Sequence, residues 1–144
     1  MKINNCVFCD IHKLNNIFIS ENKNCFSILS NPSLTYGHSL VIPKRHIEKI
    51  NELKEEEIIS IFSEIIKLQE IILKKFKGCD IRQNYRPFIK DDYYKVSHLH
   101  FHLIPRKNED ELYQKSMIHE KTIFKFLHSE ELNSIKEDIY GPTN

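Results

Sequence analysis

The sequence VSHLHFHLI, residues 96–104, places a histidine at every second position with apolar side chains between them. Side chains of a β-strand alternate between the two faces of a sheet, so residues two apart share a face. One face of such a strand is apolar and suits a core: Leu99, Phe101 and Leu103. The other face carries His98, His100 and His102. A solvated sheet face seldom carries histidine so regularly, so we expect these residues to have a chemical role.

Further strands are predicted where β-branched or aromatic residues are enriched between turn signals. Together with the histidine stretch, the predicted strands are 16–20, 25–29, 38–42, 80–85 and 95–104. Several strands beside one long helix predict an α+β fold, in which a central antiparallel sheet is covered on one side.

The long helix is predicted at 51–78, where apolar residues recur three or four positions apart. Asn51 is the expected N-cap and Gly78 the expected residue after the last turn. After Pro105 the chain is charged and predicted to be helical, with a helix at 129–139 that begins behind Ser129.

Composition limits the function classes. The 144 residues are 28% charged and 40% hydrophobic, with a formal net charge of +1. This predicts one folded domain and gives no reason to expect nucleic-acid binding. No apolar run approaches the roughly 20 residues that cross a bilayer, so no membrane partner is expected. The start of the sequence has no apolar region typical of a signal peptide, and we expect a cytoplasmic protein.

The four cysteines are Cys6, Cys9, Cys25 and Cys79. Without a secretory signal, a disulfide framework is not expected. The C-x-x-C spacing of the first pair indicates metal or redox chemistry, and a pair of reduced buried thiols is the plain alternative. A thioredoxin-like site is disfavoured because no βαβ pattern surrounds the pair.

Two kinds of chemistry fit the histidine face. Residues two apart on a strand lie about 6–7 Å apart at their Cα atoms, so several imidazoles could bind one metal ion and leave room for water. A neutral imidazole can instead act as a nucleophile that its neighbours orient. The stretch GHSLVIPKRH, residues 37–46, adds His38 on a second strand and His46 beyond its end. Spacing alone leaves both possibilities open.

The combination of CVFC (6–9), GHSLVIPKRH (37–46) and HLHFHLIPR (98–106) resembles the histidine triad (HIT) family, whose motif is His-φ-His-φ-His-φ-φ. The resemblance covers about 6–106, which leaves 109–144 as a helical C-terminal extension of a single domain over 1–144. It implies an HIT-like antiparallel sheet and a homodimer whose sheets combine. It also implies an enzyme that binds a nucleotide and cleaves at its α-phosphorus.

The resemblance also implies roles for individual residues. His100 matches the family's nucleophile, which forms a transient nucleotidyl-histidine. His102 would contact the phosphate, and His38 would support the imidazole network. A closed, structural zinc site is implied by the remaining matches: Cys6, Cys9, His46 and His98. Such a site would hold the N-terminal segment in place without activating water.

The chain departs from the family where the phosphate is held. Tyr93-Tyr94-Lys95-Val96 replaces the family's Gly-Gln-(Ser/Thr)-Val run before the triad. We expect charged donors to substitute, with Lys95 and Arg86 reaching the phosphates near Asn84. The alternative is that both cations are solvated surface charges.

The nucleoside-binding residues are harder to place. Ser30 stands where the family has its ribose-binding residue, and Asn31 would supply an amide after a shift of one position. Phe26 and Ile28 on the preceding strand are candidates for contact with the base, or else core residues.

The sequence therefore predicts a nucleotide hydrolase, with nucleotidyl transfer as a variant. The expected substrate is a nucleotide conjugate, such as a dinucleoside polyphosphate or a nucleoside phosphoramidate. Two alternatives stay open. One is a zinc-stabilised nucleotide-binding regulatory protein with little turnover, and the other is a metallohydrolase with zinc on all three triad histidines.

Overall fold

The computed structural model of the chain describes residues 5–13 and 16–142. The outermost residues of the predicted 1–144 domain, 1–4 and 143–144, lie outside the described ranges. The chain divides into two compact units, of which the first ends at Asp110 and the second begins at Glu111. The first unit contains the sheet, the long helix and the histidine motifs.

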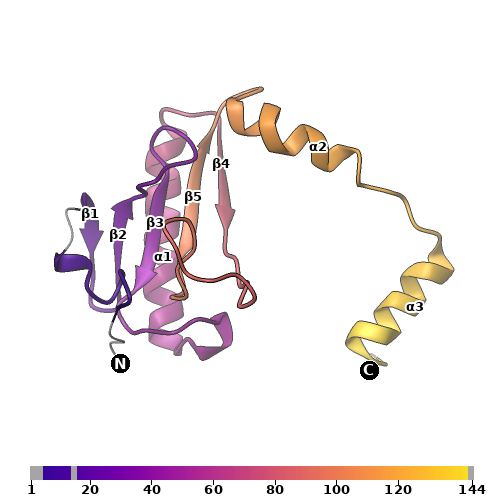
Figure 1. Cartoon of the computed structure of the whole chain (residues 1–144), viewed down its shortest axis with the longest axis horizontal. Helices are drawn as coiled ribbons and strands as arrows, with labels where there is room; N and C mark the ends of the chain where they lie inside the picture. The colour runs from indigo at the N-terminus through magenta and orange to yellow at the C-terminus, as the bar shows by residue number, and fades with distance from the viewer. Residues whose placement is uncertain (1–4, 14–15, 143–144) are drawn as a thin grey trace. The chain divides into compact units, whose positions relative to one another are not determined.

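In the described part of the chain, five antiparallel strands form a sheet in the order β1-β2-β3-β5-β4 (Figure 1). Their bounds are β1 (Phe18–Glu21), β2 (Cys25–Leu29), β3 (Ser39–Pro43), β4 (Gly78–Arg82) and β5 (Phe101–Arg106). The predicted α+β fold with a central antiparallel sheet is confirmed. β2 has the predicted bounds, whereas β1 and β3 are shifted along the chain and β4 ends at Arg82 rather than at residue 85.

The strand predicted at 95–104 begins later than expected, because β5 starts at Phe101. Upstream of it, the Leu99 backbone N–H donates a 2.6 Å hydrogen bond to the carbonyl of Ile47, in the connection after β3. His98 and His100 therefore precede the strand, and of the triad only His102 belongs to it. The predicted apolar face is confirmed, since its three side chains are each at most 5% exposed.

The long helix α1 (Glu55–Leu73) is shorter than the predicted 51–78. Asn51 is not its N-cap but lies in a short 3-10 turn, η2 (Ile50–Glu52). Lys54 precedes the helix instead, and its backbone N–H donates a 2.8 Å hydrogen bond to the Glu57 carboxylate. This bond gives a partner to the backbone N–H group at the helix start. The acidic side chains of the first turn lie at the positive end of the helix dipole, where negative charge is favourable.

At its other end α1 stops at Leu73, and Gly78 is not its terminating residue but the first residue of β4. Gly78 pairs with Arg106 of β5. A Cβ atom added to Gly78 would lie 3.3 Å from the Arg106 Cβ atom. Close approach of two strands therefore accounts for this glycine.

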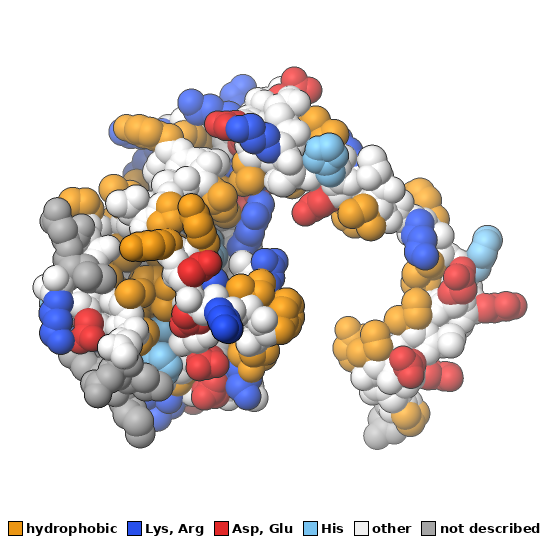
Figure 2. Space-filling view, in the orientation of Figure 1, with side chains coloured by type: hydrophobic (Ala, Val, Ile, Leu, Met, Phe, Trp, Pro, Cys, Tyr) orange, Lys and Arg blue, Asp and Glu red, His pale blue; other side chains and the backbone are white. Residues whose placement is uncertain are grey.

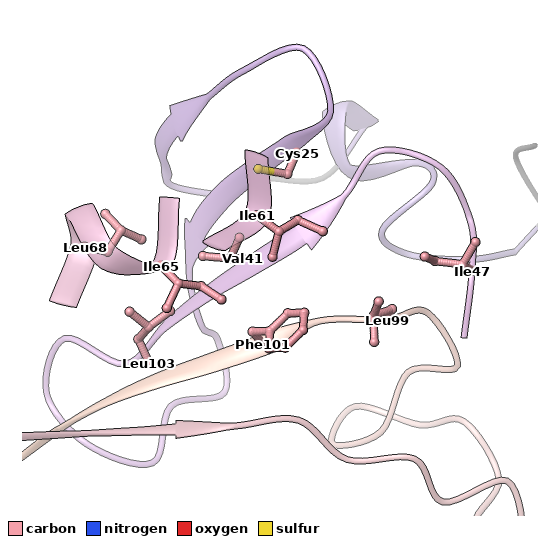
Figure 3. Close-up of a cluster of buried hydrophobic side chains, with 9 residues drawn as sticks. All are labelled: Cys25, Val41, Ile47, Ile61, Ile65, Leu68, Leu99, Phe101 and Leu103. Atoms are coloured by element: carbon pink, nitrogen blue, oxygen red, sulfur yellow. The ribbon is translucent and has the colours of Figure 1, made fainter. Parts of the chain in front are cut away.

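The main core lies between α1 and one face of the sheet (Figures 1 and 3). Ile61 and Ile65 of the helix are almost fully buried against strand residues that include Val41 and Leu103. The nine clustered side chains are Cys25, Val41, Ile47, Ile61, Ile65, Leu68, Leu99, Phe101 and Leu103. Burial of apolar side chains at this interface is the main force that holds the helix on the sheet.

The opposite face of the sheet is also covered, by the N-terminal segment. Its second buried cluster comprises Cys6, Phe8, Cys9, Ile11, Phe26, Ile28, Leu40 and Ile42. Leu40 of β3 pairs in register with His102 of β5. Directly paired residues of antiparallel strands share a face, so His102 lies on the same side as the segment with both N-terminal cysteines.

The second unit is helical. It contains a π-helical turn η3 (Tyr113–Met117), α2 (Ile118–Lys121) and α3 (Ser129–Tyr140). α3 agrees with the predicted 129–139, but His128 occupies the N-cap position and Ser129 is the first helical residue. Exposed hydrophobic side chains lie along this segment, among them Leu132, Ile135 and Ile139 (Figure 2). None of the helices formed by the described residues has the length and apolar character needed to cross a membrane.

Candidate functional site

Four potential metal ligands converge on the face opposite α1: Cys6, Cys9, His46 and His98. Their ligand atoms all lie within 4.8 Å of one another. The Cys6 Sγ atom is 3.4 Å from His98 Nδ1, and the Cys9 Sγ atom is 3.4 Å from His46 Nδ1. The C-x-x-C turn, the connection after β3 and the segment before β5 each contribute, so the cluster forms only in the folded chain.

The surroundings of His98 leave one ring nitrogen available to a metal. Its Nε2 atom lies 2.8 Å from the carbonyl oxygen of Pro43, which can only accept, so Nε2–H donates and Nδ1 is free to ligate. Burial lowers the pKa of His98 to about 4, so the ring is neutral at pH 7. Two cysteine sulfur atoms and two imidazole nitrogens at this separation form a donor set that zinc prefers. The residues present therefore fit a four-ligand zinc ion.

Phe8, between the two cysteines, links this cluster to the next histidine. Its ring makes edge contacts with His98 and with His100, at centroid distances of 5.7 and 5.2 Å. Phe8 is 9% exposed. Phe8 was not among the predicted site residues, although its place inside CVFC was a signal.

His38 and His102 form a second histidine cluster. The Leu34 backbone N–H donates a 3.1 Å hydrogen bond to His38 Nδ1, so a neutral His38 carries its hydrogen on Nε2. His38 Nε2 lies 2.9 Å from His102 Nδ1 and donates to it. His102 is therefore left with its hydrogen on Nε2. Burial lowers the pKa of His38 to about 4 and that of His102 to about 3, so both rings are neutral at pH 7.

His100 has the opposite arrangement of hydrogen. Its Nδ1 atom lies 2.6 Å from the carbonyl oxygen of His98 and must donate to it, so the lone pair of the neutral ring is on Nε2. No hydrogen bond joins Nε2 to the residues that the structure describes. Burial lowers the pKa of His100 below its ordinary value, which keeps the lone pair available at neutral pH.

A cavity of about 230 Å³ adjoins His100 and His102. The loop between β4 and β5 supplies the rest of its lining: Asn84, Arg86, Ile89, Asp92, Tyr94, Lys95 and Val96. The three loop residues predicted to hold phosphate, Asn84, Arg86 and Lys95, thus lie around the same hollow as two triad histidines. Lys95 forms a 2.7 Å ion pair with Asp91 and also donates to the Ser97 hydroxyl.

The predicted nucleoside contacts lie elsewhere. Ser30 and Asn31 are not part of the lining of this cavity, and the Ser30 hydroxyl donates a 2.7 Å hydrogen bond to the Pro32 carbonyl. Phe26 and Ile28 are 4% and 2% exposed within the second core cluster, which fits a packing role. A ribose or base contact for any of the four stays a prediction.

Arg82 is a further residue that the sequence did not single out. It ends β4 and pairs in register with His102, so its side chain lies on the histidine face of the sheet. Burial is the largest cause of the lowered pKa values of His38 and His102, and the positive charge of Arg82 is a further cause. Only the strand register, which depends on the fold, reveals this position.

The site therefore combines a neutral histidine cluster on one face of an antiparallel sheet with a Cys₂His₂ set that fits a metal ion. The model of the HIT domain family matches residues 12–109. The chain belongs to the HIT domain family.

Three relatives with enzyme names illustrate the likeness. An adenosine 5′-monophosphoramidase of Schizosaccharomyces pombe is 32% identical over 73% of this chain and 77% of its own. An adenylylsulfatase of Arabidopsis thaliana is 30% identical over 74% and 55%. An asymmetrical bis(5′-nucleosyl)-tetraphosphatase of Schizosaccharomyces pombe is 34% identical over 51% and 40%.

Solved structures agree with the fold. An HIT-family protein from Bacillus subtilis has a TM-score of 0.72 at 25% identity, over 98% of this chain and 99% of the other. A zinc-bound histidine triad protein from Mycobacterium smegmatis has a TM-score of 0.65 at 29% identity, over 75% and 79%.

Proposed function

We propose that this protein is a nucleotide hydrolase that cleaves a nucleotide conjugate at its α-phosphorus, with His100 as the nucleophile. The observation that carries the proposal is the hydrogen bond from His100 Nδ1–H to the His98 carbonyl. It leaves the nucleophilic lone pair on Nε2, in a ring that lines the cavity. The enzyme names of the relatives support a hydrolase of this kind.

The reaction has two displacements. In the first, His100 Nε2 forms a bond to the α-phosphorus while the bond to the leaving group breaks and the leaving group takes its electron pair. In the second, water attacks the nucleotidyl-histidine, releases a nucleoside monophosphate and restores the imidazole lone pair. Transfer to an acceptor other than water is the nucleotidyl-transferase variant.

His102 and His38 would act on the charge that develops at phosphorus. Because His38 donates to His102 Nδ1, His102 has an Nε2–H that can donate to a phosphoryl oxygen. One preorganised donor of this kind contributes about a hundredfold or more to the rate in other enzymes. His38 is a positioning residue, because its hydrogen bond to His102 Nδ1 keeps the His102 hydrogen on Nε2.

The Cys₂His₂ cluster would hold a structural zinc ion. A four-coordinate ion with four protein ligands has no open position for water, so it would stabilise the fold rather than take part in hydrolysis. This assigns His98 to the metal and leaves His100 and His102 for chemistry. Zinc on all three triad histidines is disfavoured, since the Nδ1 atom of His98 is next to Cys6 and His100 Nδ1 is bonded to a carbonyl.

We also propose a homodimer in the cytoplasm. α1 exposes apolar side chains on the side away from the core, including Ile59 and Ile66. β4 is an edge strand that carries a half-exposed Ile81. Pairing through these surfaces would bury the apolar helix side and the open sheet edge together. Thiol ligands for zinc suit a reducing compartment.

A nucleotide-binding regulatory protein with little turnover is the second candidate. The observation in its favour is Lys95, which stands where the family holds phosphate and is itself tied to Asp91. Hydrolysis of adenosine 5′-phosphoramidate and diadenosine tetraphosphate by wild type and His100→Asn separates the candidates. We expect AMP release by the wild type only; binding without hydrolysis would favour the regulatory protein, and equal rates would refute the role of His100.

A further inference from the structure

The loop between β4 and β5 carries an arginine whose charge is not neutralised locally. Arg86 lines the cavity beside His100 and His102. Within the part of the chain that the structure describes, its guanidinium has no ion pair and no hydrogen bond. Glu48 lines a neighbouring hollow together with Arg86, but the two do not form an ion pair. Arg86 is therefore an available cation at the mouth of the histidine site.

The other charged residues that line the cavity from this loop, Asp92 and Lys95, are satisfied within the loop. Lys95 is held by Asp91, whose other carboxylate oxygen accepts a 2.8 Å hydrogen bond from the Ser97 backbone N–H. Asp92 also lines the cavity, but its carboxylate accepts bonds of 2.7 and 2.9 Å from the backbone N–H groups of Tyr94 and Lys95. These bonds hold the loop in shape, and among the described residues they leave Arg86 as the cavity-lining charge of the loop without a partner.

A second arginine reaches the same region from the sheet. Arg82 is paired in register with His102, and its one ion pair among the described residues is a long, 3.4 Å contact with Asp80. Asp80 is itself engaged by Arg106, at 2.5 Å. A loop cation that lines the cavity and a strand cation paired with His102 therefore both contribute positive charge near the histidine site.

This positive charge exceeds what an α-phosphate requires. In a phosphodiester or phosphoramidate the α-phosphate carries a single negative charge, for which the His102 Nε2–H and the Asn84 amide are sufficient neutral donors. An amine leaving group offers nothing for a guanidinium to bind. A phosphate chain does, because arginine binds phosphate oxygens in pairs.

We propose that Arg86, supported by Arg82, forms a subsite for an anionic leaving group, so that the preferred substrate is a nucleotide joined to further phosphates rather than to an amine. This rests on the proposed hydrolase function. Tyr94 lines the same cavity and is 86% exposed, which provides a ring on which the second base of a dinucleoside polyphosphate stacks. The relatives' names include both substrate classes. In this chain, Arg86 is the residue that favours the phosphate-linked class over the amine-linked class.

The test compares two substrates that share the adenylyl group and differ in the charge of the leaving group: diadenosine tetraphosphate and adenosine 5′-phosphoramidate. The kcat/KM values are measured for the wild type, Arg86→Gln and Arg86→Lys. Lys90→Gln is the matched control, because Lys90 is an exposed cation of the same loop and does not line the cavity.

We expect Arg86→Gln to lower kcat/KM for the tetraphosphate about 10- to 100-fold, the range for a hydrogen bond to a charged group. The phosphoramidate value should change less than about twofold, Arg86→Lys should recover part of the loss, and Lys90→Gln should have little effect. Equal losses on both substrates, or no loss on the tetraphosphate, would overturn the proposal.

The same variants distinguish this inference from the proposed function. If the wild type hydrolyses neither substrate, the proposed function fails, and the subsite is tested by calorimetric binding of inorganic tripolyphosphate. Weaker binding by Arg86→Gln than by the wild type and Lys90→Gln would support an anion subsite. Equal binding by all three proteins would refute it.

Discussion

Acid should destabilise this protein through the pair of buried neutral histidines, His38 and His102. In the unfolded chain a histidine has a pKa of about 6.5, whereas burial lowers the pKa of His38 in the fold to about 4. Below pH 6.5 the unfolded state binds a proton that the native His38 does not bind. Stability contributed by this residue is therefore present above pH 6.5 and is lost as the pH falls toward 4.

The magnitude follows from these two pKa values. Between pH 8 and pH 5, linkage predicts that His38 alone lowers the free energy of unfolding by about 2 kcal/mol. This is a sizeable share of the roughly 5–15 kcal/mol that stabilises a typical domain. Replacement by a side chain that does not titrate should remove this part of the pH dependence, whatever it does to stability at pH 8.

Urea unfolding of the wild type and of His38→Gln at pH 5 and pH 8, with the same excess of zinc, measures this difference. We expect the loss of stability between the two pH values to be about 2 kcal/mol smaller in His38→Gln. His128→Gln is the control, because His128 is exposed in the C-terminal unit. An equal pH dependence in the wild type and His38→Gln would refute the argument from burial.

Three further predictions concern the metal, the core and the dimer. Cys6→Ser should be purified without stoichiometric zinc and should melt at a lower temperature, as elemental analysis and calorimetry would show; retained zinc would contradict the ligand set. Leu103→Ala, at a fully buried position, should cost about 2–5 kcal/mol in urea unfolding, against less than about 0.5 kcal/mol for Ile17→Ala, which is 61% exposed in the wild type. Ile66→Glu should convert a dimer to a monomer in sedimentation, and a monomeric wild type would refute the proposed interface.

The fold was largely predictable because burial controls the pattern of side chains. Leu99, Phe101 and Leu103 alternate correctly into the core even though Leu99 lies outside β5. The start of the strand was not predictable, because the backbone of Leu99 pairs with Ile47, and no local pattern reports a contact across the fold. Gly78 was misassigned for a similar reason. The sequence does not distinguish a glycine that ends a helix from a glycine that lets two strands approach closely.

The four candidate metal ligands could be predicted from the motifs, but the arrangement of the histidine site could not. The motifs brought Cys6 and His98 into one proposed site, and the structure places their ligand atoms 3.4 Å apart. The hydrogen positions on His38 and His100 follow from backbone partners that have no sequence signature. Arg82 was missed because its position beside the histidines depends on the pairing of β4 with β5.

The central claim is that His100 carries the nucleotide during turnover, and trapping this intermediate tests it most directly. Adenylyl-labelled substrate is mixed with the protein, quenched in denaturant at alkaline pH within the first turnover, and the modified peptide is located by mass spectrometry. We predict one adenylyl group on His100, labile to acid and absent from His100→Asn. Rapid hydrolysis without label on the protein, or label on another residue, would contradict the account.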